Sequence, residues 1–395
     1  MKKIVSINGT NFGSTGNIAR QIGELAMLEG MEYHNAYPWA EGSKAVNCND
    51  IVIGNKWGKI LSVGLGRITG YAGCFSMIAT RKFLRSLDKI KPDIIHIHNL
   101  HDGFINISML FKYINKNHIK VIWTMHDCWS FTGRCAYFTM AGCDKWKKGC
   151  YECPQKYCYP TRYVDKTKKM WKLKKKWFSG VKDLTIVTPS KWLKSEVEKS
   201  FMSQYPVKVI NNGIDLDKFK PSISDFRTKN NIEDKFVVLG VALSWEERKG
   251  LDDILELMNI LDDSYAYILV GTDDEVDKIL PKDVISIHRT HDQAELAEVY
   301  SAADVYINPT KEENYPTVNM EALACGTPVV TYATGGSAEI IDKTCGIAVK
   351  TNDINGLAEA IKTIKNNNSY LDACLKKSSD FDMKDRFKEY IDLYR

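Results

Sequence analysis

The sequence lacks any apolar run of about 18 residues, the length that a membrane-spanning helix requires. Residues 1–7 begin with two lysines and a short apolar segment, which is too short for the hydrophobic region of a secretory signal. Low-complexity tracts and fixed-period repeats are also absent, which excludes solenoid folds. We therefore expect a cytoplasmic protein whose eleven cysteines mostly stay reduced.

Short apolar segments alternate with helical segments along the whole sequence. This alternation is typical of parallel sheets with helices on both faces, so the predicted fold class is α/β, in two domains. The predicted strands are 3–7, 93–97, 120–125, 184–187, 207–210, 236–242, 265–270, 284–287, 305–308, 329–332 and 347–349. The predicted helices are 18–29, 191–201, 251–261, 293–303, 355–365 and 383–394.

Two glutamates eight positions apart, Glu313 and Glu321, stand on either side of a predicted loop-to-helix junction. Thr317 is the predicted N-cap of a helix at 318–325. The first turn of a helix offers unpaired N–H groups and a positive dipole end, so 314–318 is a predicted anion site. Glu321 could accept two hydrogen bonds from a vicinal diol such as a ribose, and Glu313 could contact a second sugar.

This segment and its Ala-Cys-Gly-Thr-Pro-Val-Val continuation resemble the E-x7-E motif of the retaining glycosyltransferases of family four, which have the GT-B fold. The resemblance implies that Glu321 binds the nucleotide ribose and that Glu313 binds the donor sugar. The candidate donor-binding residues here are Asn314, Tyr315, Pro316, Thr317, Val318 and Glu321.

The resemblance also implies two Rossmann-like, doubly wound domains that face a central cleft. The Asn-Gly-Ile-Asp segment that starts at Asn212 resembles the connection between the domains in this family. We expect an N-terminal acceptor-binding domain at 1–212 and a C-terminal nucleotide-sugar-binding domain at 213–380. A C-terminal helix at 381–395 is expected to cross back and pack on the first domain.

The basic pair Arg248-Lys249 follows the first strand of the second half. A departing nucleoside diphosphate develops negative charge, so a fixed cation beside it lowers the barrier to transfer. Lys249 and Gly250 match the Lys-Gly of the family pattern. The family's arginine lies five or six positions earlier, where this chain has Ser244 and Leu243. We infer that Arg248 replaces it; the alternative is a solvated basic turn.

His126 lies just after the strand at 120–125, in a Thr-x-His-Asp context that matches the family's donor-contacting histidine. It is expected to hydrogen-bond the donor sugar and not to act as a general base, although a lone histidine there is more often structural. No positioned nucleophile is evident, so the resemblance implies same-face attack with retention. The candidate catalytic residues are His126, Lys249, Arg248 and Glu313.

The glycines of the loop after the first strand, Gly13 and Gly16, are further donor-binding candidates, because glycine lets a backbone approach a ligand closely. A tight strand-to-helix turn explains either glycine equally well. Asn11 interrupts the G-x-G-x-x-G spacing, so a dinucleotide cofactor is disfavoured and no catalytic cofactor is expected.

Cysteine and histidine offer two candidate metal sites. His96 and His98 share a strand face but lack an obvious third ligand, so no metal is expected there. Four cysteines with C-x7-C-x6-C-x2-C spacing could hold a structural zinc, although the first pair is more widely spaced than in a standard zinc knuckle. The alternative is a set of reduced, half-buried thiols; we favour zinc at Cys135, Cys143, Cys150 and Cys153.

A basic stretch at 156–208 holds 14 Lys and Arg against 4 Asp and Glu. Within it, residues 166–178 read as an amphipathic helix that either packs its apolar side on the sheet or lies on an anionic bilayer. We favour packing; the stretch 60–85 is a second, weaker candidate for membrane contact. The basic stretch at 156–208 lacks an RNA-binding signature and its tryptophans follow a helix face, so no nucleic-acid partner is expected.

The leading hypothesis is a retaining glycosyltransferase with a nucleotide-sugar donor and a saccharide acceptor, which is expected to be lipid-linked. The acceptor partner is either a saccharide or a polyprenyl-diphosphate-linked saccharide. The Asn11–Gly16 and His126–Trp129 segments look like those of bacterial surface-polysaccharide enzymes, for O-antigen, capsule or exopolysaccharide. Such an enzyme is expected to contact the inner face of the membrane peripherally. The alternatives are a nucleotide-sugar epimerase of the same fold and a non-catalytic nucleotide-sugar-binding scaffold.

Overall fold

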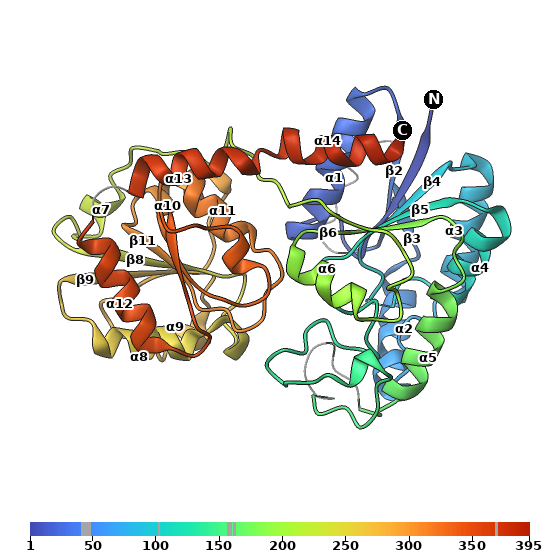
Figure 1. Ribbon diagram of the computed structural model, residues 1–395, viewed down its shortest axis with the longest axis horizontal. Coiled ribbons are helices and arrows are strands. Elements are labelled where there is room, and N and C mark those ends of the chain that lie inside the picture. Colours follow the sequence, from blue (N-terminus) through green and yellow to red (C-terminus); the bar gives the residue numbers. More distant parts are fainter. Residues whose placement is uncertain (41–48, 102, 156–159, 161–162, 368–369) are drawn as a thin grey trace. The chain divides into compact units, whose positions relative to one another are not determined.

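The computed structural model describes residues 1–40, 49–101, 103–155, 160, 163–367 and 370–395. The chain divides into two compact units. The first unit is Met1–Asn211 together with Arg386–Arg395, and the second unit is Asn212–Asp385. Each unit is built on a parallel sheet with helices around it (Figure 1).

The first unit holds a seven-stranded sheet in the order β3-β2-β1-β4-β5-β6-β7. Its strands are β1 Lys3–Ile7, β2 Glu32–Pro38, β3 Ile51–Ile53, β4 Ile94–Ile97, β5 Lys120–Thr124, β6 Leu184–Thr188 and β7 Val207–Val209. Its helices are α1 Gly13–Leu28, α2 Lys56–Thr69, α3 Met77–Ile90, α4 Ile107–Asn117, the 3-10 helix Lys145–Lys147, α5 Thr167–Phe178 and α6 Lys191–Glu198.

The second unit holds a six-stranded sheet in the order β10-β9-β8-β11-β12-β13. Its strands are β8 Phe236–Val241, β9 Tyr265–Val270, β10 Ile285–Ile287, β11 Val305–Asn308, β12 Val329–Tyr332 and β13 Gly346–Val349. Its helices are α7 Phe226–Lys229, α8 Leu251–Ile260, α9 Asp274–Asp277, α10 Gln293–Ser301, α11 Thr317–Ala324, α12 Ile354–Lys365, α13 Tyr370–Ser378 and the 3-10 helices Glu247–Lys249, Ser337–Glu339 and Ser379–Phe381.

Central strands such as β9 are buried along their whole length, because helices cover both faces of the sheet. In both sheets the first strand of the unit lies beside the second and the fourth, as β1 lies between β2 and β4. The strand order therefore reverses next to β1 in the first unit and next to β8 in the second. At such a switch point the loops after two neighbouring strands separate, which is where open α/β sheets bind ligands.

The last helix, α14 (Met383–Tyr394), starts in the second unit and ends on the first. The Tyr394 hydroxyl lies 2.6 Å from Nδ1 of His96 on β4. Nε2 of His96 lies 2.8 Å from Oγ1 of Thr124 on β5, and that hydroxyl lies 3.2 Å from the Tyr390 hydroxyl. These side chains are buried, so the helix is joined to the sheet by a small polar network inside the core.

Every strand predicted from the sequence is present, with bounds that differ by a residue or two. Two strands, β2 and β3, lay outside the prediction. β2 carries His34, Asn35 and Pro38, which weaken its apolar pattern, and β3 has only three residues. They are recognisable only through their pairing with β1 and with each other.

Replacing Tyr394 with phenylalanine leaves Nδ1 of the buried His96 without its partner, while the ring still packs. We expect the free energy of unfolding of the first unit to fall by about 1–3 kcal/mol, the cost of an unsatisfied buried polar group. Urea unfolding followed by tryptophan fluorescence reports on this unit, because all tryptophans except Trp245 lie in it. Tyr163→Phe, on an exposed ring, is the matched control and should match the wild type.

Candidate active site

In the second unit, the switch point lies beside β8, where the loop after β8 and the loop after β11 are neighbours. The β8 loop ends in the 3-10 helix Glu247–Lys249 and Gly250, and the β11 loop runs from Pro309 to Pro316. The two loops are in direct contact, since the Lys311 N–H donates to the Arg248 carbonyl at 2.8 Å. A Cβ at Gly250 would lie 2.4 Å from the Pro309 carbonyl oxygen, so only glycine permits this approach.

Lys249 and Glu313, one from each loop, form an ion pair. Lys249 Nζ lies 3.0 Å from Oε2 of Glu313, and the Asn314 N–H donates to Oε1 at 3.0 Å. Burial acts to raise the pKa of Glu313, but the charge of Lys249, the Asn314 N–H and Arg248 outweigh it and lower the pKa below its ordinary value. Glu313 is therefore an ionised carboxylate held in one orientation.

Arg248 lies beside this pair. Its Nη1 donates to the Glu312 carbonyl at 3.0 Å, and its charge contributes to the lowered pKa of Glu313. At the family's upstream arginine position, Leu243 is 98% exposed and Ser244 hydrogen-bonds Glu246. Arg248 is thus a second cation close to Glu313, and its replacement of the family's upstream arginine stays a prediction.

Glycine and asparagine residues that sequence reasoning missed hold the 313–316 segment in place. The Gly336 N–H donates to the Asn314 carbonyl at 2.7 Å, and Asn212 Nδ2 donates to the Tyr315 carbonyl at 3.2 Å. A Cβ at Gly335 would lie 1.7 Å from the Glu313 carbonyl oxygen. The Gly-Gly pair after β12 was the only sequence signal for this support, and it reads equally well as an ordinary turn.

Helix α11 begins directly after this segment. The predicted N-cap, Thr317, is wrong: Thr317 is the first helical residue and the N-cap is Pro316, which has no side chain that can cap. The Thr317 hydroxyl instead hydrogen-bonds the Glu321 carboxylate one turn later. Because no side chain caps this end, the first N–H groups of α11 and its positive dipole end are suited to an anion.

Glu321 lies in the body of α11 without a cationic partner among the groups that shift its pKa. Burial raises the pKa of Glu321 to about 7, against smaller opposing hydrogen bonds from Thr317 and Tyr300. The Tyr300 hydroxyl donates to Oε2 at 3.3 Å. A carboxylate that is poorly solvated and weakly bonded gains much from added hydroxyl donors, which suits it to a diol.

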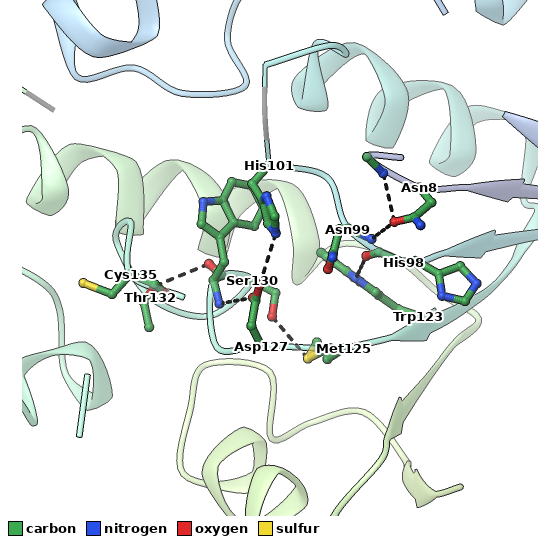
Figure 2. A network of polar contacts seen from close by, with 12 residues as sticks. Asn8, His98, Asn99, His101, Trp123, Met125, Asp127, Ser130, Thr132 and Cys135 are labelled. Carbon is green, nitrogen blue, oxygen red and sulfur yellow. Dashed lines mark hydrogen bonds and ion pairs between the residues drawn. The ribbon is translucent and has the colours of Figure 1, made fainter. Parts of the chain in front are cut away.

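In the first unit, the loops after β1 and β4 meet at the switch point. Asn8, directly after β1, accepts hydrogen bonds at Oδ1 from the Gly9 N–H at 2.9 Å and the Asn99 N–H at 3.2 Å (Figure 2). Gly13 is the first residue of α1. A Cβ at Gly16 would lie 2.6 Å from the Asn11 carbonyl carbon. Gly16 thus allows the loop to close on itself, and the role of both glycines in donor binding stays a prediction.

His126 follows β5 and forms a pair with His98, which follows β4. Nδ1 of His98 lies 2.9 Å from Nε2 of His126, with the rings stacked at 5.2 Å. Burial lowers the pKa of His126 to about 4, so it is neutral near pH 7 and suited to hydrogen bonding, not to holding charge. Nε2 of His101 lies 3.1 Å from Oδ2 of Asp127, which fixes the segment after His126 (Figure 2).

The basic helix at 166–178 packs into the first unit. In α5, Met170, Trp171 and Phe178 are buried, which confirms the packing interpretation. A group of exposed apolar side chains lies instead on α2 and the start of α3. Most of it falls within the stretch 60–85, which the sequence ranked second for membrane contact, and the rest lies just before that stretch. The group consists of Trp57, Ile60, Leu61, Leu65, Ile68, Met77 and Ile78.

Comparison with known proteins assigns both halves of the chain. Residues 57–218 match the family model described as Glycosyltransferase Family 4, and residues 222–381 match the model described as Glycosyl transferases group 1. The second match contains Lys249, Glu313 and Glu321, and the first contains His126. The chain belongs to the glycosyltransferases that combine these two domains.

Curated relatives and solved structures agree with this assignment. The chain is 24% identical over 371 residues, 89% of its length and 87% of the relative's, to WcaC of Escherichia coli K12, named for a glycosyl transferase role in colanic acid biosynthesis. It is 28% identical over 163 residues, 38% of its length and 43% of the relative's, to a Campylobacter jejuni N,N'-diacetylbacillosaminyl-diphospho-undecaprenol alpha-1,3-N-acetylgalactosaminyltransferase. The sucrose-phosphate synthase of Thermosynechococcus elongatus superposes with a TM-score of 0.75 at 20% identity, covering 100% of this chain and 98% of that one, which shows the shared GT-B fold.

These relatives are transferases, which favours the transferase over the epimerase and the scaffold among our initial hypotheses. Among the residues that the structure describes, none of the helices combines the length and the apolar character that crossing a bilayer requires.

Glu321 should make the stability of this glycosyltransferase pH-dependent. Because its pKa rises from 4.5 to about 7 on folding, the folded state binds its proton more tightly than the unfolded chain does. The stability contributed by this group is fully present below about pH 4.5 and is lost as the pH rises to about 7, by about 1 kcal/mol per pH unit. Urea unfolding of the wild type and Glu321→Gln between pH 4.5 and pH 8 measures this loss, because glutamine does not titrate.

The difference in unfolding free energy between the two proteins should change up to about pH 7 and be constant above it. Parallel stability curves would contradict the assigned pKa. Glu359→Gln, at an exposed position of α12, controls for the loss of a carboxylate in general.

Proposed function

We propose that this glycosyltransferase moves a sugar, with retention of anomeric configuration, from a nucleoside diphosphate to a lipid-linked saccharide during bacterial surface-polysaccharide synthesis. The observation that carries the proposal is the Lys249–Glu313 ion pair, which lies where the β8 and β11 loops meet, directly before the N-terminus of α11. Cations, helix N–H groups and two carboxylates at one switch point match the parts of an activated sugar: a diphosphate, a ribose and a hexose.

In this proposal the diphosphate takes Lys249 and the first turn of α11 as its ligands. The phosphate then replaces Glu313 as the partner of Lys249, and the Glu313 carboxylate turns to the hydroxyls of the donor sugar. Glu321 accepts hydrogen bonds from the ribose diol. As the bond to the anomeric carbon breaks, charge accumulates on the β-phosphate, and the ammonium of Lys249 and the guanidinium of Arg248 stabilise it.

The reaction needs no carboxylate nucleophile in this arrangement. Glu313 is stabilised as an anion by Lys249 and the Asn314 N–H, which lowers its basicity and nucleophilicity. The departing phosphate oxygen can accept the proton of the acceptor hydroxyl that attacks from the same face. His126, neutral and oriented by His98, is suited to hydrogen-bond a sugar hydroxyl.

Donor binding can be tested with a panel of nucleotide sugars, using hydrolysis and thermal protection of the purified protein as readouts. Lys249→Ala and Glu321→Ala should each weaken donor binding or turnover by about 1–3 kcal/mol, the range for hydrogen bonds to charged groups. Lys278→Ala, an exposed lysine on the surface of the same unit, is the matched control. Unchanged donor binding and turnover in both site variants would refute the assignment.

A lipid-linked acceptor brings the enzyme to a membrane, and α2 is the surface suited to meet it. Its apolar side chains are exposed, with Trp57 at 76%, and a groove of about 490 Å³ lies between α2, α3 and β3. The sequence from Ile51 to Leu87 contains no Asp or Glu. Its cations are Lys56, Lys59, Arg67, Arg81, Lys82 and Arg85. Exposed apolar side chains among cations favour an anionic bilayer surface.

Co-sedimentation with phosphatidylglycerol vesicles tests this surface. The wild type should bind them, and should bind phosphatidylcholine vesicles or vesicles in high salt much less. Lys56→Ala and Lys59→Ala should each weaken binding about fivefold, at about 1 kcal/mol per cation, and Trp57→Ser should weaken it further. Ile223→Ser, another exposed apolar position, is the control. Binding that is equal for all these proteins would exclude α2 as the docking surface.

A further inference from the structure

The 125–166 segment between β5 and α5 is long for a connection inside an α/β domain. Its described part has little regular structure, with the 3-10 helix Lys145–Lys147 as its helical element. Its first part, up to Phe138, packs into the hydrophobic core of the unit, whereas residues 139–155 are mostly exposed or half-buried. Trp146 is the buried anchor of this second part, and its ring lies 5.1 Å from Phe131 and 4.8 Å from Phe138. One buried tryptophan is small support for residues 139–155, so a further constraint is expected there.

Four thiols of this segment surround one cavity. Cys135, Cys143, Cys150 and Cys153 all line a cavity of about 20 Å³, together with Phe138 and Trp146. A cavity of this size has room for about one water molecule or one ion. All four cysteines are free thiols. Cysteines separated by up to 18 positions in the sequence thus line the same cavity. Reduced cysteines without a common function need not be gathered in this way.

The thiols already contact hydrogen-bond donors and one another. The Cys135 and Cys153 thiols share a hydrogen bond. The Gly133 N–H donates to Cys150 Sγ at 3.1 Å, and a Cβ at Gly133 would lie 2.8 Å from the Cys150 Cβ, so glycine is required there. Backbone N–H groups directed at sulfur stabilise thiolates and are typical of the residues that surround a metal-bound cysteine.

Two buried cations lie against the same segment. Arg134 Nη1 lies 3.9 Å from Cys153 Sγ, and Lys174 of α5 donates from Nζ to the Trp129 carbonyl at 2.6 Å and the Thr132 carbonyl at 3.1 Å. Both side chains are buried. Four thiolates around a divalent ion carry a net charge of −2, which these two cations balance in a poorly solvated environment.

We propose that Cys135, Cys143, Cys150 and Cys153 bind a structural zinc ion. Four thiols release four protons and become thiolates that coordinate Zn²⁺ tetrahedrally, without a redox step. No three of their sulfurs lie within 4.8 Å of one another in the structure, so binding includes rotation of the side chains toward the cavity. The metal fixes the segment that begins with His126 and Asp127, and it takes no part in sugar transfer.

Metal analysis of the full-length protein, expressed in zinc-supplemented medium, tests the proposal. The wild type should hold about one zinc per chain, and Cys150→Ser and Cys153→Ser should lose it. Cys74→Ser, a partly exposed cysteine outside the cluster, is the matched control and should keep it. Zinc-free wild type, or zinc retained in both cluster variants, overturns the proposal.

A second measurement does not depend on the variants folding. Cobalt added to metal-depleted wild type should give the intense charge-transfer absorption of cobalt–thiolate bonds and protect four thiols from a thiol reagent. Zinc should raise Tm and slow tryptic cleavage at Lys145, Lys147 and Lys148, which lie within the segment. Cobalt binding without thiolate absorption, or a disulfide between Cys135 and Cys153 in the native protein, overturns the proposal.

Discussion

The ion pair between Lys249 and Glu313 is the contact on which the donor half of the site depends. It joins two loops that follow different strands, in surroundings where either charge alone would be costly. The pair keeps an ammonium group beside the N-terminus of α11 before any ligand arrives. In the proposed binding mode, a donor diphosphate competes with Glu313 for this cation, and the competition makes the carboxylate available to the sugar as the phosphate binds.

The two glutamates of the motif have opposite electrostatic surroundings, although they are eight positions apart. Cations and an N–H group lower the pKa of Glu313, whereas burial without a cation raises the pKa of Glu321. Glu313 is therefore ionised near neutral pH, whereas Glu321 changes its protonation there. Sequence spacing predicts that both acids lie near the loop-to-helix junction, but the difference between them arises from Lys249, which is distant in sequence.

Sequence patterns predicted the parts of the fold that are set by burial, and failed where tertiary contacts decide. Buried strands such as β9 read as apolar runs, whereas β2, with its polar residues, was missed. Thr317 has the chemistry of an N-cap, yet Pro316 takes that position because its extended backbone places the 313–316 loop for contact with Asn212 and Gly336. Gly335 gave no functional signal, since its importance lies in the approach of a loop from another strand.

The amphipathic helices α2 and α5 show the same limit of sequence patterns, because composition alone does not reveal which of them is buried. Both α2 and α5 combine apolar and basic residues, and α5 carries more lysines. In α5 one of these lysines, Lys174, is fully buried against carbonyls of the cysteine-containing segment, so its charge serves internal structure.

The same segment connects the histidine pair of the first unit to the cysteine cluster. The proposed role of His126, to orient a sugar hydroxyl, requires a fixed backbone after β5. Asp127 contributes to this by hydrogen-bonding His101 and accepting the Trp129 N–H. Beyond Trp129, the segment is held by Lys174, by the packing of Phe131, Phe138 and Trp146, and by the contacts of the thiols. Because residues 139–155 bury little beyond Trp146, a metal bound by the four cysteines would supply the rigidity that this part of the unit cannot obtain from the core.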